Sequence, residues 1–396
     1  MKMTVKDIDV SGKRVLVRCD FNVPMNNGAI TDDGRIAAVL PTIDYLIDQG
    51  AKVVLISHLG RPDGEPNLKY TLEPVAKRLS EFLGKEVAFE SSPKVVDDKV
   101  IYHISQMHDR DISLLENLRF RKEEEENDPV FAKELASLAD FFVNDAFGTA
   151  HRAHASTVGI AKYIPAVSGF LMEKEEEFLV DAVEHPKRPF LAIMGGAKVK
   201  DKIKVIENLL DKVDTLIIGG GMAFPFLKAM GFEVGLSLLE EEGIEIANEL
   251  LEKSKAKKVE IFLPLDVVCA TEFSNDADHD IYDRDSIPKD RMGLDIGPKS
   301  IEAFKLEIAK AKTIFWNGPM GVFEMPNYAM GTLQVARGMA ASKEVTIIGG
   351  GDSAAAVEQF GLTEKITHIS TGGGASLELL EGKELPGISV LLDKEL

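Results

Sequence analysis

The chain has 396 residues, of which 45% are hydrophobic and 28% are charged, and these proportions are ordinary for a globular protein large enough to hold two domains. Its formal net charge at pH 7 is -19, because 65 Asp and Glu residues outnumber 46 Lys and Arg residues. So acidic a surface repels nucleic acid and anionic membranes, and neither is an expected partner. A small anionic ligand would need a local basic pocket that opposes this overall charge.

Short apolar, β-branched runs alternate with amphipathic segments along the chain. Because these runs are continuously apolar, they are typical of strands buried on both faces of a parallel sheet. The pattern therefore predicts an α/β protein with parallel sheets. Examples of the expected strands are residues 14–18, 52–57, 141–145, 190–194, 215–218, 260–263, 313–316 and 345–348, and the expected helices include residues 169–183, 200–210, 240–253 and 333–341.

A domain boundary is expected near residues 165–190, where the long helical pattern of residues 169–183 is followed by the break HPKRP. Residues 1–170 contain nine arginines, whereas the remaining 226 residues contain four. Glycine clusters show the opposite distribution, since every GG or GGG run lies after residue 190. The first half is therefore expected to bind anions through guanidinium groups, and the second half through backbone amides.

Four arginines of the first half lie at strand ends or in loops, or open a helix, rather than lying on helix faces. Arg61 and Arg152 follow strands, Arg119 lies in LLENLRF, and Arg35 opens a helix in ITDDGRIAAVL. A guanidinium group binds phosphate or carboxylate oxygens through two parallel hydrogen bonds. Any one of these arginines alone is more simply part of a surface ion pair. Together they predict the local basic pocket that an anionic ligand would need.

Histidines and an Asp–Asn pair accompany these arginines. His58, His151 and His154 raise the alternative of a zinc site, but the HxxH spacing has no carboxylate partner motif. Hydrogen bonding to substrate oxygens is therefore the favoured hypothesis for the histidines. Asp20 and Asn22 lie just past the first strand. They either bind a hydroxyl and a carboxylate of a substrate or build the turn that follows.

Four apolar strands of the second half run directly into glycines and then into a helix, in FLAIMGGAKVKDK, TLIIGGGMAF, VTIIGGGDSAAAV and ITHISTGGGASLELL. Glycine lets the backbone turn tightly, and the following helix N-terminus offers unpaired N–H groups to a phosphate. One such turn is often only structural, but four in one domain favour nucleotide binding. No GxxxxGK[ST] is present, so this is not a P-loop NTPase. No GxGxxG fits a dinucleotide-binding unit either.

Charged residues beside the glycines refine this prediction. Lys198 and Lys202 are four apart at an expected helix start, so they would share one face and bind an anion between them; a solvated lysine-rich face is the alternative. Asp352 follows a GGG run, where a carboxylate is favourable if Mg²⁺ bridges it to a phosphate. A helix N-cap is the alternative for Asp352 and is compatible with that role. Ser353 either donates to a phosphate oxygen or caps the helix.

Two cysteines and the lack of long apolar runs indicate the compartment. Cys19 and Cys269 are far apart, and neither belongs to a CxxC motif or a metal-ligand spacing. Two buried free thiols are typical of a reducing compartment. The first residues contain no apolar core of secretory length, and no segment approaches the roughly 18 apolar residues of a membrane span. We therefore expect a cytoplasmic protein.

Longer segments of the sequence resemble the phosphoglycerate kinase family, and its bacterial members in particular. The matching segments keep the family's order and span residues 14–387, essentially the whole chain. They are RVLVRCDFNVP, ITDDGRI, SHLGRP, LLENLRF, FVNDAFGTAHRAHAST, GGAKVKDKI, LIIGGGMAF, SNDA, LDIGPKS, WNGPMGVFE, GGGDSAAAV and STGGGASLELLEGKELPG. Two positions depart from the family's pattern, namely Pro225 after GGGMAF and Leu236 in GFEVGLSLLE.

The resemblance implies two doubly wound, Rossmann-like parallel-sheet domains joined by a helix, in a bilobed enzyme that closes at a hinge. The first domain, residues 1–169, would bind phosphoglycerate, and residues from about 380 to 396 would pack back onto it. The second domain, residues 170–379, would include the linking helix and bind the nucleotide. The helix near residues 170–183 and the loop after Gly372 are the expected hinges.

The resemblance also implies site residues, which form two sets. Phosphoglycerate would be bound by Asp20, Asn22, Arg35, His58, Leu59, Gly60, Arg61, Arg119 and Arg152. The nucleotide would be bound by Lys198, Lys202, Gly220, Gly221, Gly293, Asn317, Glu324, Gly350, Gly351, Asp352 and Ser353. Glu324 would hold the ribose hydroxyls and Asp352 the metal ion. Catalytic positive charge would come from Arg35, Lys198 and Lys202, together with helix amides at Gly373.

The expected activity is that of a phosphoglycerate kinase, which reversibly transfers a phosphoryl group between 1,3-bisphosphoglycerate and ADP in glycolysis and gluconeogenesis. Such an enzyme would use Mg²⁺ with ATP or ADP, act as a monomer and take only small-molecule substrates. An NAD-dependent dehydrogenase is one alternative, and the missing GxGxxG fingerprint counts against it. A non-catalytic relative used as a binding scaffold is the other, although every expected catalytic position holds a competent residue.

Overall fold

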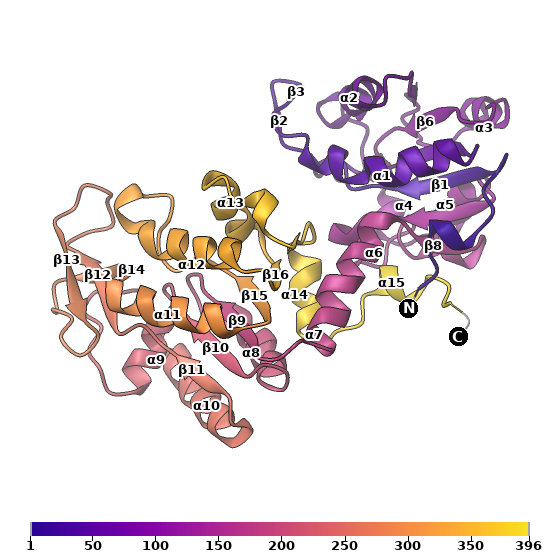
Figure 1. Cartoon of the computed structure of the whole chain (residues 1–396). Coiled ribbons are helices and arrows are strands. Elements are labelled where there is room, and N and C mark those ends of the chain that lie inside the picture. Colours follow the sequence, from indigo (N-terminus) through magenta and orange to yellow (C-terminus); the bar gives the residue numbers. More distant parts are fainter. Residues whose placement is uncertain (1, 395–396) are drawn as a thin grey trace. The chain divides into compact units, whose positions relative to one another are not determined.

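The structure is a computed structural model that describes residues 2–394, and it forms two compact units. Within this range, the first unit comprises the residues up to Glu176 together with those from Glu384 onward, and the second comprises Glu177–Lys383. The division lies inside the helical segment that sequence analysis assigned to the second domain. Each unit is built around a six-stranded sheet whose neighbouring strands are all parallel, which confirms the predicted α/β class (Figure 1).

The sheet of the first unit has the order β5-β6-β4-β1-β7-β8. Its strands are β1 (Arg14–Arg18), β4 (Lys52–Ile56), β5 (Ala88–Glu90), β6 (Ile112–Leu115), β7 (Phe141–Asn144) and β8 (Ala166–Ser168), and a separate hairpin consists of β2 (Met25–Asn26) and β3 (Ala29–Ile30). Its helices are α1 (Gly34–Asp48), α2 (Glu73–Leu83), α3 (Asp98–Ser105), α4 (Lys122–Glu125), α5 (Pro129–Ala136), α6 (Phe170–Glu176) and α15 (Pro386–Ser389). Val15 and Val17 of β1 share one buried cluster with Val39 and Ile43 of α1. Alternate residues of a strand face opposite sides, so the buried Leu16 packs against the other layer.

The sheet of the second unit has the order β11-β10-β9-β15-β16-β17, so the strand order reverses between β9 and β15. Its strands are β9 (Phe190–Met194), β10 (Thr215–Ile218), β11 (Glu260–Phe262), β15 (Thr313–Asn317), β16 (Val345–Ile348) and β17 (His368–Ile369). One group of helices that contact each other is α8 (Ile203–Leu210), α9 (Ala223–Ala229) and α10 (Glu241–Lys257), and a second group is α11 (Pro298–Lys310), α12 (Met330–Ala341) and α13 (Gly351–Gln359). Such a reversal, with a helix layer on each face, is the doubly wound arrangement (Figure 1).

A small antiparallel sheet in the second unit was not among the expected strands. It consists of β12 (Asp266–Ala270), β13 (His279–Asp283) and β14 (Met292–Ile296), with β12 in the middle. Its β13 strand is at the edge and largely exposed, and therefore lacks the continuous apolar run that marks the parallel strands.

The helical segment expected over residues 169–183 is helical throughout but not uniform. It consists of α6, a π-helical turn over Glu177–Asp181, and α7 (Ala182–Glu184). Asp145 caps the start of α6, since its Oδ1 accepts hydrogen bonds from the backbone N–H groups of Leu171 and Met172 at 2.9 and 3.1 Å. Burial raises the pKa of Asp145 to about 7. The wider turn therefore lies where the division between the units falls, about two helical turns beyond a well-anchored start.

The C-terminal segment of the first unit crosses its β7–β8 side. The backbone N–H of Met3 donates to Leu392 O at 2.7 Å, and the N–H of Leu392 donates to Ala166 O at 2.9 Å. The side-chain amide of Asn144, at the end of β7, donates to Gly387 O at 3.0 Å. Residues from Glu384 are thereby tied to strands that lie more than two hundred positions earlier in the sequence.

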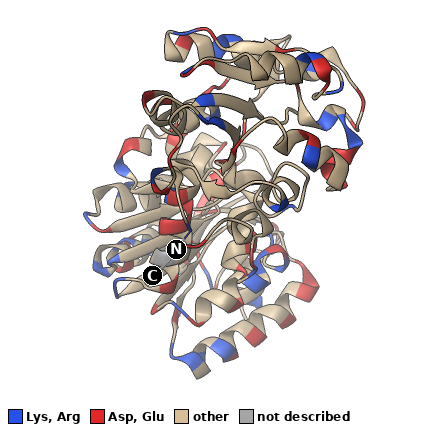
Figure 2. Cartoon of the chain, turned by 90° about the vertical axis from the view of Figure 1, so that its right-hand side faces the viewer, with Lys and Arg blue, Asp and Glu red and all other residues tan. Residues whose placement is uncertain are grey.

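The surface carries charges of both signs over its helices (Figure 2). Among residues 2–394, no helix combines the length and the apolar character that crossing a membrane requires.

We predict that Asn144→Ala loosens the C-terminal segment. The buried Asn144 amide makes two hydrogen bonds, one to Gly387 O and one from the N–H of Ala146, and each contributes about 1–3 kcal/mol when its loss leaves a buried partner unsatisfied. Amide hydrogen exchange over residues 384–392 should become faster, and the urea concentration that unfolds the first unit should fall. Asn26→Ala, at an exposed position in β2, is the control and should change neither. Unchanged exchange in the Asn144 variant would contradict this role.

Candidate functional site

The carboxyl ends of four parallel strands bring most of the arginine-containing loops together in the first unit. Arg18 ends β1, His58 follows β4, Arg119 follows β6, and Arg152 lies in the loop after β7. These strands are neighbours in the sheet, so their following residues meet at one edge. Burial holds the pKa of His58 well below its usual value, and the charges of Arg18, Arg119 and Arg152 act in the same direction. The cations that sequence analysis expected to form a local basic pocket thus include Arg119 and Arg152, which the sheet brings to the same edge as Arg18 and His58.

Arg119 has a buried guanidinium group at this edge, and only part of its hydrogen-bonding capacity is used within the described chain. Its side chain is nearly buried, with Nη1 donating to Gly60 O at 3.0 Å and Nε lying 3.4 Å from Glu125 Oε1. Its Nη2 is buried and has no hydrogen-bond partner within the described chain. An unsatisfied donor on a buried cation is costly, so this group is poised to receive an anionic oxygen.

The loops around Asp20 and His58 hold one another in place. Arg35 Nη1 and Asp20 Oδ2 form an ion pair at 2.9 Å, and Asn22 Oδ1 accepts a hydrogen bond from the N–H of Gly60 at 2.9 Å. Gly60 has a φ of +61°, and a Cβ there would lie 2.5 Å from the ring of Tyr70. Asn22 therefore ties the loop after β1 to the turn after β4, which is a different contact from the turn after the first strand that sequence analysis considered.

The remaining predicted residues of this edge differ in environment. Leu59 is buried, whereas Arg61 is exposed. Arg152 is half-buried, and its Nε lies 3.3 Å from His151 Nε2. Burial lowers the pKa of His154 to about 4, helped by the neighbouring arginines. No three His, Cys, Asp or Glu side chains in the described residues are grouped as metal ligands.

All four glycine turns of the second unit lie at the carboxyl edge of its sheet, because β9, β10, β16 and β17 are parallel. The turns after β9 and β15 touch at the point where strand order reverses. Gly318 has a φ of +96°, and a Cβ there would lie 2.2 Å from Gly195 O. A side chain at this position would therefore force the two turns apart.

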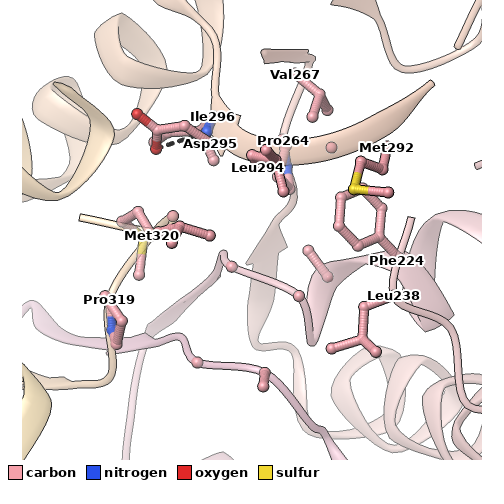
Figure 3. A pocket seen from close by; sticks show the side chains of 18 of the residues that line it. Phe224, Leu238, Pro264, Val267, Met292, Leu294, Asp295, Ile296, Pro319 and Met320 are labelled. Atoms are coloured by element: carbon pink, nitrogen blue, oxygen red, sulfur yellow. Dashed lines mark hydrogen bonds between the residues drawn. The ribbon is translucent and has the colours of Figure 1, made fainter. Parts of the chain in front are cut away.

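A cavity of about 560 Å³ opens beside these turns (Figure 3). Phe224, Leu238 and Met292 lie on one side of it, and Pro319 and Met320 lie on the other. Five of the predicted nucleotide residues line it, namely Gly220, Gly221, Gly293, Glu324 and Asp352. Sequence analysis did not single out the apolar wall, because its residues come from α9, the loop before α10 and the small sheet, and they converge only in the folded unit.

Lys202 and Lys198 occupy different environments. Lys202 Nζ donates to Gly195 O at 2.7 Å and to Asn317 O at 3.3 Å, between the turns after β9 and β15. Burial lowers the pKa of Lys202 to about 8, opposed by the charges of Asp352 and Asp201. Lys198 is half-exposed, and its Nζ lies 3.4 Å from Glu240 Oε1.

The expectation that Lys198 and Lys202 share one helix face is wrong. The first helical turn begins only at Lys200, so Lys198 lies in the preceding irregular segment and helical spacing does not apply to the pair. The glycines of the turn delay the helix, which the four-residue spacing could not reveal.

Several predicted residues support the turns from beneath. Ser353 Oγ is buried and accepts a hydrogen bond from the N–H of Gly318 at 2.6 Å, and Asn317 Nδ2 donates to Gly349 O at 2.6 Å. Gly350 and Gly351 precede Asp352, which is exposed on the first turn of α13. Gly373, with a φ of +45°, precedes α14 (Gly374–Leu380).

Comparisons with known sequences agree along the whole chain. A sequence profile described as Phosphoglycerate kinase matches residues 5–383. A phosphoglycerate kinase of Clostridium tetani is 58% identical over 394 residues, covering 99% of this chain and 98% of that protein. One of Clostridium botulinum is 59% identical over 394 residues, covering 99% of each.

Solved structures show the same relationship. A phosphoglycerate kinase from Coxiella burnetii has a TM-score of 0.92 at 44% identity, covering 98% of each chain. Another from Pyrococcus horikoshii has a TM-score of 0.79 at 36% identity, also covering 98% of each. The chain belongs to the phosphoglycerate kinase family and is a phosphotransferase of glycolysis.

Proposed function

We propose that the chain performs the phosphoglycerate kinase reaction with its two substrates bound at different sheet edges. The basic edge of the first unit would take 3-phosphoglycerate or 1,3-bisphosphoglycerate, and the cavity of the second unit would take ATP or ADP. The observation that carries this assignment is the buried Nη2 of Arg119, which has no hydrogen-bond partner in the described chain and so offers a charged donor to an anion at the first edge. The apolar cavity beside glycine turns has the complementary chemistry of a nucleotide site.

The reaction moves one phosphoryl group between two oxygens. In the forward direction the bond between phosphorus and the carboxyl oxygen of 1,3-bisphosphoglycerate breaks, and a bond to the terminal phosphate oxygen of ADP forms, giving 3-phosphoglycerate and ATP. The accepting oxygen is already ionised in either direction, so no general base is needed. Since the transition state spreads negative charge over three equatorial oxygens, the protein contributes alignment, positive charge and exclusion of water.

At the first edge, the guanidinium groups bind the phosphate and carboxylate of the glycerate. Arg119 offers a buried donor for which nothing in the described chain competes, and Arg35 offers a partly exposed one that already pairs with Asp20. His58 is buried among these cations and neutral, so it contributes a hydrogen bond rather than charge. The remaining residues of this proposed set are Asn22, Leu59, Gly60, Arg61 and Arg152.

At the second edge, the base lies against the apolar wall, and the phosphates lie along the glycine turns. Glu324, exposed at the cavity wall, is placed to accept hydrogen bonds from ribose hydroxyls. Lys202 is held by two carbonyl oxygens and directs its positive charge at the transferring group, with Lys198 as a more exposed contributor. The remaining residues of this proposed set are Gly220, Gly221, Gly293, Asn317, Gly350, Gly351, Ser353 and Gly373.

We propose that Mg²⁺ accompanies the nucleotide and that Asp352 holds it. The side chains present fit this role, because a single exposed carboxylate beside glycine turns suits an ion whose other ligands are phosphate oxygens and waters. The described residues offer no grouped set of three protein ligands that would make a separate metal site. When bound, Mg²⁺ neutralises phosphate charge. Asp352 also affects Lys202 when no metal is bound, because its negative charge raises the pKa of Lys202 against the burial that lowers it.

The partners that this proposal requires are small molecules. Each proposed site is assembled from residues of one chain, so a monomer is sufficient. Cys19 and Cys269 are buried and form no disulfide, which suits the reducing cytoplasm.

We predict that Lys202→Ala and Arg119→Ala change different kinetic constants in the phosphorylation of 3-phosphoglycerate by ATP. The reaction is measured by coupling it to glyceraldehyde-phosphate dehydrogenase and following NADH oxidation. Lys202→Ala should lower kcat by about 10²- to 10³-fold, because it removes a charge that acts on the transition state. Arg119→Ala should mainly raise the KM for 3-phosphoglycerate. Lys200→Ala is the control, since Lys200 is exposed and pairs with Glu242. A Lys202 variant that raises only the KM for ATP would reverse the assignment.

We predict that Asp352→Asn raises the Mg²⁺ concentration needed for half-maximal activity by about tenfold or more, because a charged ligand becomes a neutral one. Calorimetric titration should show weaker binding of ATP in the presence of Mg²⁺ and little change when EDTA removes the metal. Asp201→Asn, an exposed carboxylate near Lys202, is the matched control. Equal weakening with and without metal would assign Asp352 a structural role instead.

Because the two substrates are proposed to bind to different units, transfer requires the units to bring them together. The π-helical turn at Glu177–Asp181 and the glycines before α14 are the proposed points of bending. Small-angle scattering should show a smaller radius of gyration with both 3-phosphoglycerate and an unreactive ATP analogue than with either alone. An unchanged radius with both ligands bound would exclude this closure.

A further inference from the structure

Four buried side chains form one hydrogen-bonded chain beneath the basic edge. They are Glu124 of α4, Ser156 in the loop after β7, Arg18 at the end of β1, and His58 after β4. Their exposures are 0%, 0%, 1% and 4% respectively. Neither Arg18, Ser156 nor Glu124 belongs to the substrate set proposed above, so the chain lies behind the residues that would touch the glycerate.

The hydrogen bonds of this chain have a fixed direction. A guanidinium group only donates, so Arg18 Nε donates to Ser156 Oγ at 2.9 Å, and Nη1 donates to the backbone oxygen of Cys19. Ser156 Oγ in turn donates to Glu124 Oε1, and the Ser156 N–H donates to Glu124 Oε2 at 3.1 Å. Two nitrogens of Arg18 are therefore fixed by acceptors. Glu124 holds Ser156 in place, and Ser156 in turn sets the orientation of the guanidinium group.

The third nitrogen of Arg18 determines the state of His58. Nη2 of Arg18 lies 3.2 Å from Nδ1 of His58. Because the guanidinium cannot accept, Nδ1 must be the unprotonated ring nitrogen, and the single ring proton must be on Nε2. The opposite tautomer would place two N–H groups against each other inside a buried cluster.

We propose that Arg18, held by Ser156 and Glu124, is a positioning residue that fixes His58 as the neutral tautomer with its proton on Nε2, so that the ring donates a hydrogen bond to an anionic oxygen of the glycerate substrate. This inference rests on the proposed assignment of His58 to the glycerate site. Its consequence is that His58 stays a donor, rather than an acceptor that would repel the substrate oxygen.

The charges around His58 maintain the same state across pH. Arg18 from β1, Arg35 from α1, Arg119 after β6 and Arg152 after β7 all disfavour a second ring proton, and burial acts in the same direction, so the pKa of His58 is well below its usual value. The negative groups nearby are Asp20 and Glu124, which act on Arg18. His154 faces Glu124, with Nδ1 3.8 Å from Oε1, and is itself neutral because its pKa is lowered to about 4.

Selective ¹⁵N labelling of histidine tests the proposal on the unaltered protein. Long-range ¹H–¹⁵N spectra, with the His58 signals assigned from their loss in His58→Ala, should show the Nε2–H neutral pattern throughout about pH 6 to 8. A predominant Nδ1–H pattern, or protonation near the ordinary value for histidine, would overturn the proposal without any change to Arg18.

Arg18→Lys tests the same point through function. Lysine keeps the charge but cannot reach Ser156, the Cys19 oxygen and His58 together. We expect mixed tautomers of His58 and a KM for 3-phosphoglycerate raised by about tenfold or more, with the KM for ATP unchanged. Ser156→Ala should change the same quantities in the same direction while retaining Arg18. Arg14→Lys, at the opposite end of β1 where the half-buried Arg14 pairs with Asp140, is the control.

His58→Ala separates failure of this proposal from failure of the function proposed for His58. If it leaves the KM for 3-phosphoglycerate unchanged, the assignment of His58 to the substrate is wrong, and the inference falls with it. If it raises that KM while Arg18→Lys and Ser156→Ala leave both the tautomer and the KM unchanged, the substrate role survives and the positioning role of Arg18 is excluded.

Discussion

Parallel pairing of the strands is the constraint on which both candidate sites depend. In a parallel sheet every strand ends at the same edge, so residues that follow strands far apart in sequence meet without any local contact of their own. In the first unit this brings His58, Arg119 and the loop of Arg152 to one place. In the second unit it presses the turns after β9 and β15 against each other, and the cavity opens where the strand order reverses. Glycine is required at Gly318 because the two backbones approach too closely for any side chain.

The electrostatics of the two edges bear on how so acidic a chain would bind the anionic substrates proposed for it. The first edge gathers several guanidinium groups. Burial lowers the pKa of Arg18 and of Arg119, and the charges of Arg18 and Arg152 lower the pKa of Arg119 further. The buried carboxylate of Glu124 offsets part of this, since Arg18 and Ser156 stabilise its charge against the burial that raises its pKa. At the second edge, the hydrogen bonds of Lys202 Nζ within the described residues go to carbonyl oxygens. The first edge therefore has cations that would attract the proposed anionic substrate, whereas the cavity of the second unit is also lined by Asp295, Glu324 and Asp352.

The parallel sheets could be predicted from the sequence because their strands are continuously apolar. Strands β1, β9, β10 and β16 have the expected bounds, and β4, β7, β11 and β15 differ by one residue at one end. The small antiparallel sheet could not be predicted in this way. Its β13 strand, HDIYD, is an exposed edge strand, and β14 combines a glycine with Asp295, which is buried yet hydrogen-bonded to the N–H of Gly331 at 2.8 Å. The apolar wall of the cavity depends on this sheet and was missed with it.

What could be predicted of the sites follows a similar division. Glycine turns and loop arginines could be identified because a few consecutive residues indicate their chemistry. Arg18 is the last residue of an apolar strand, and the neighbouring sequence does not indicate its role. Its importance becomes apparent only from the direction of its hydrogen bonds, because a group that can donate but never accept dictates the protonation of every partner it meets. The spacing of Lys198 and Lys202 misled for the converse reason, since the glycines that make the turn also delay the helix. Sequence patterns thus indicate which groups are present at a proposed phosphate-binding edge, while the buried hydrogen bonds beneath it determine what each group can do there.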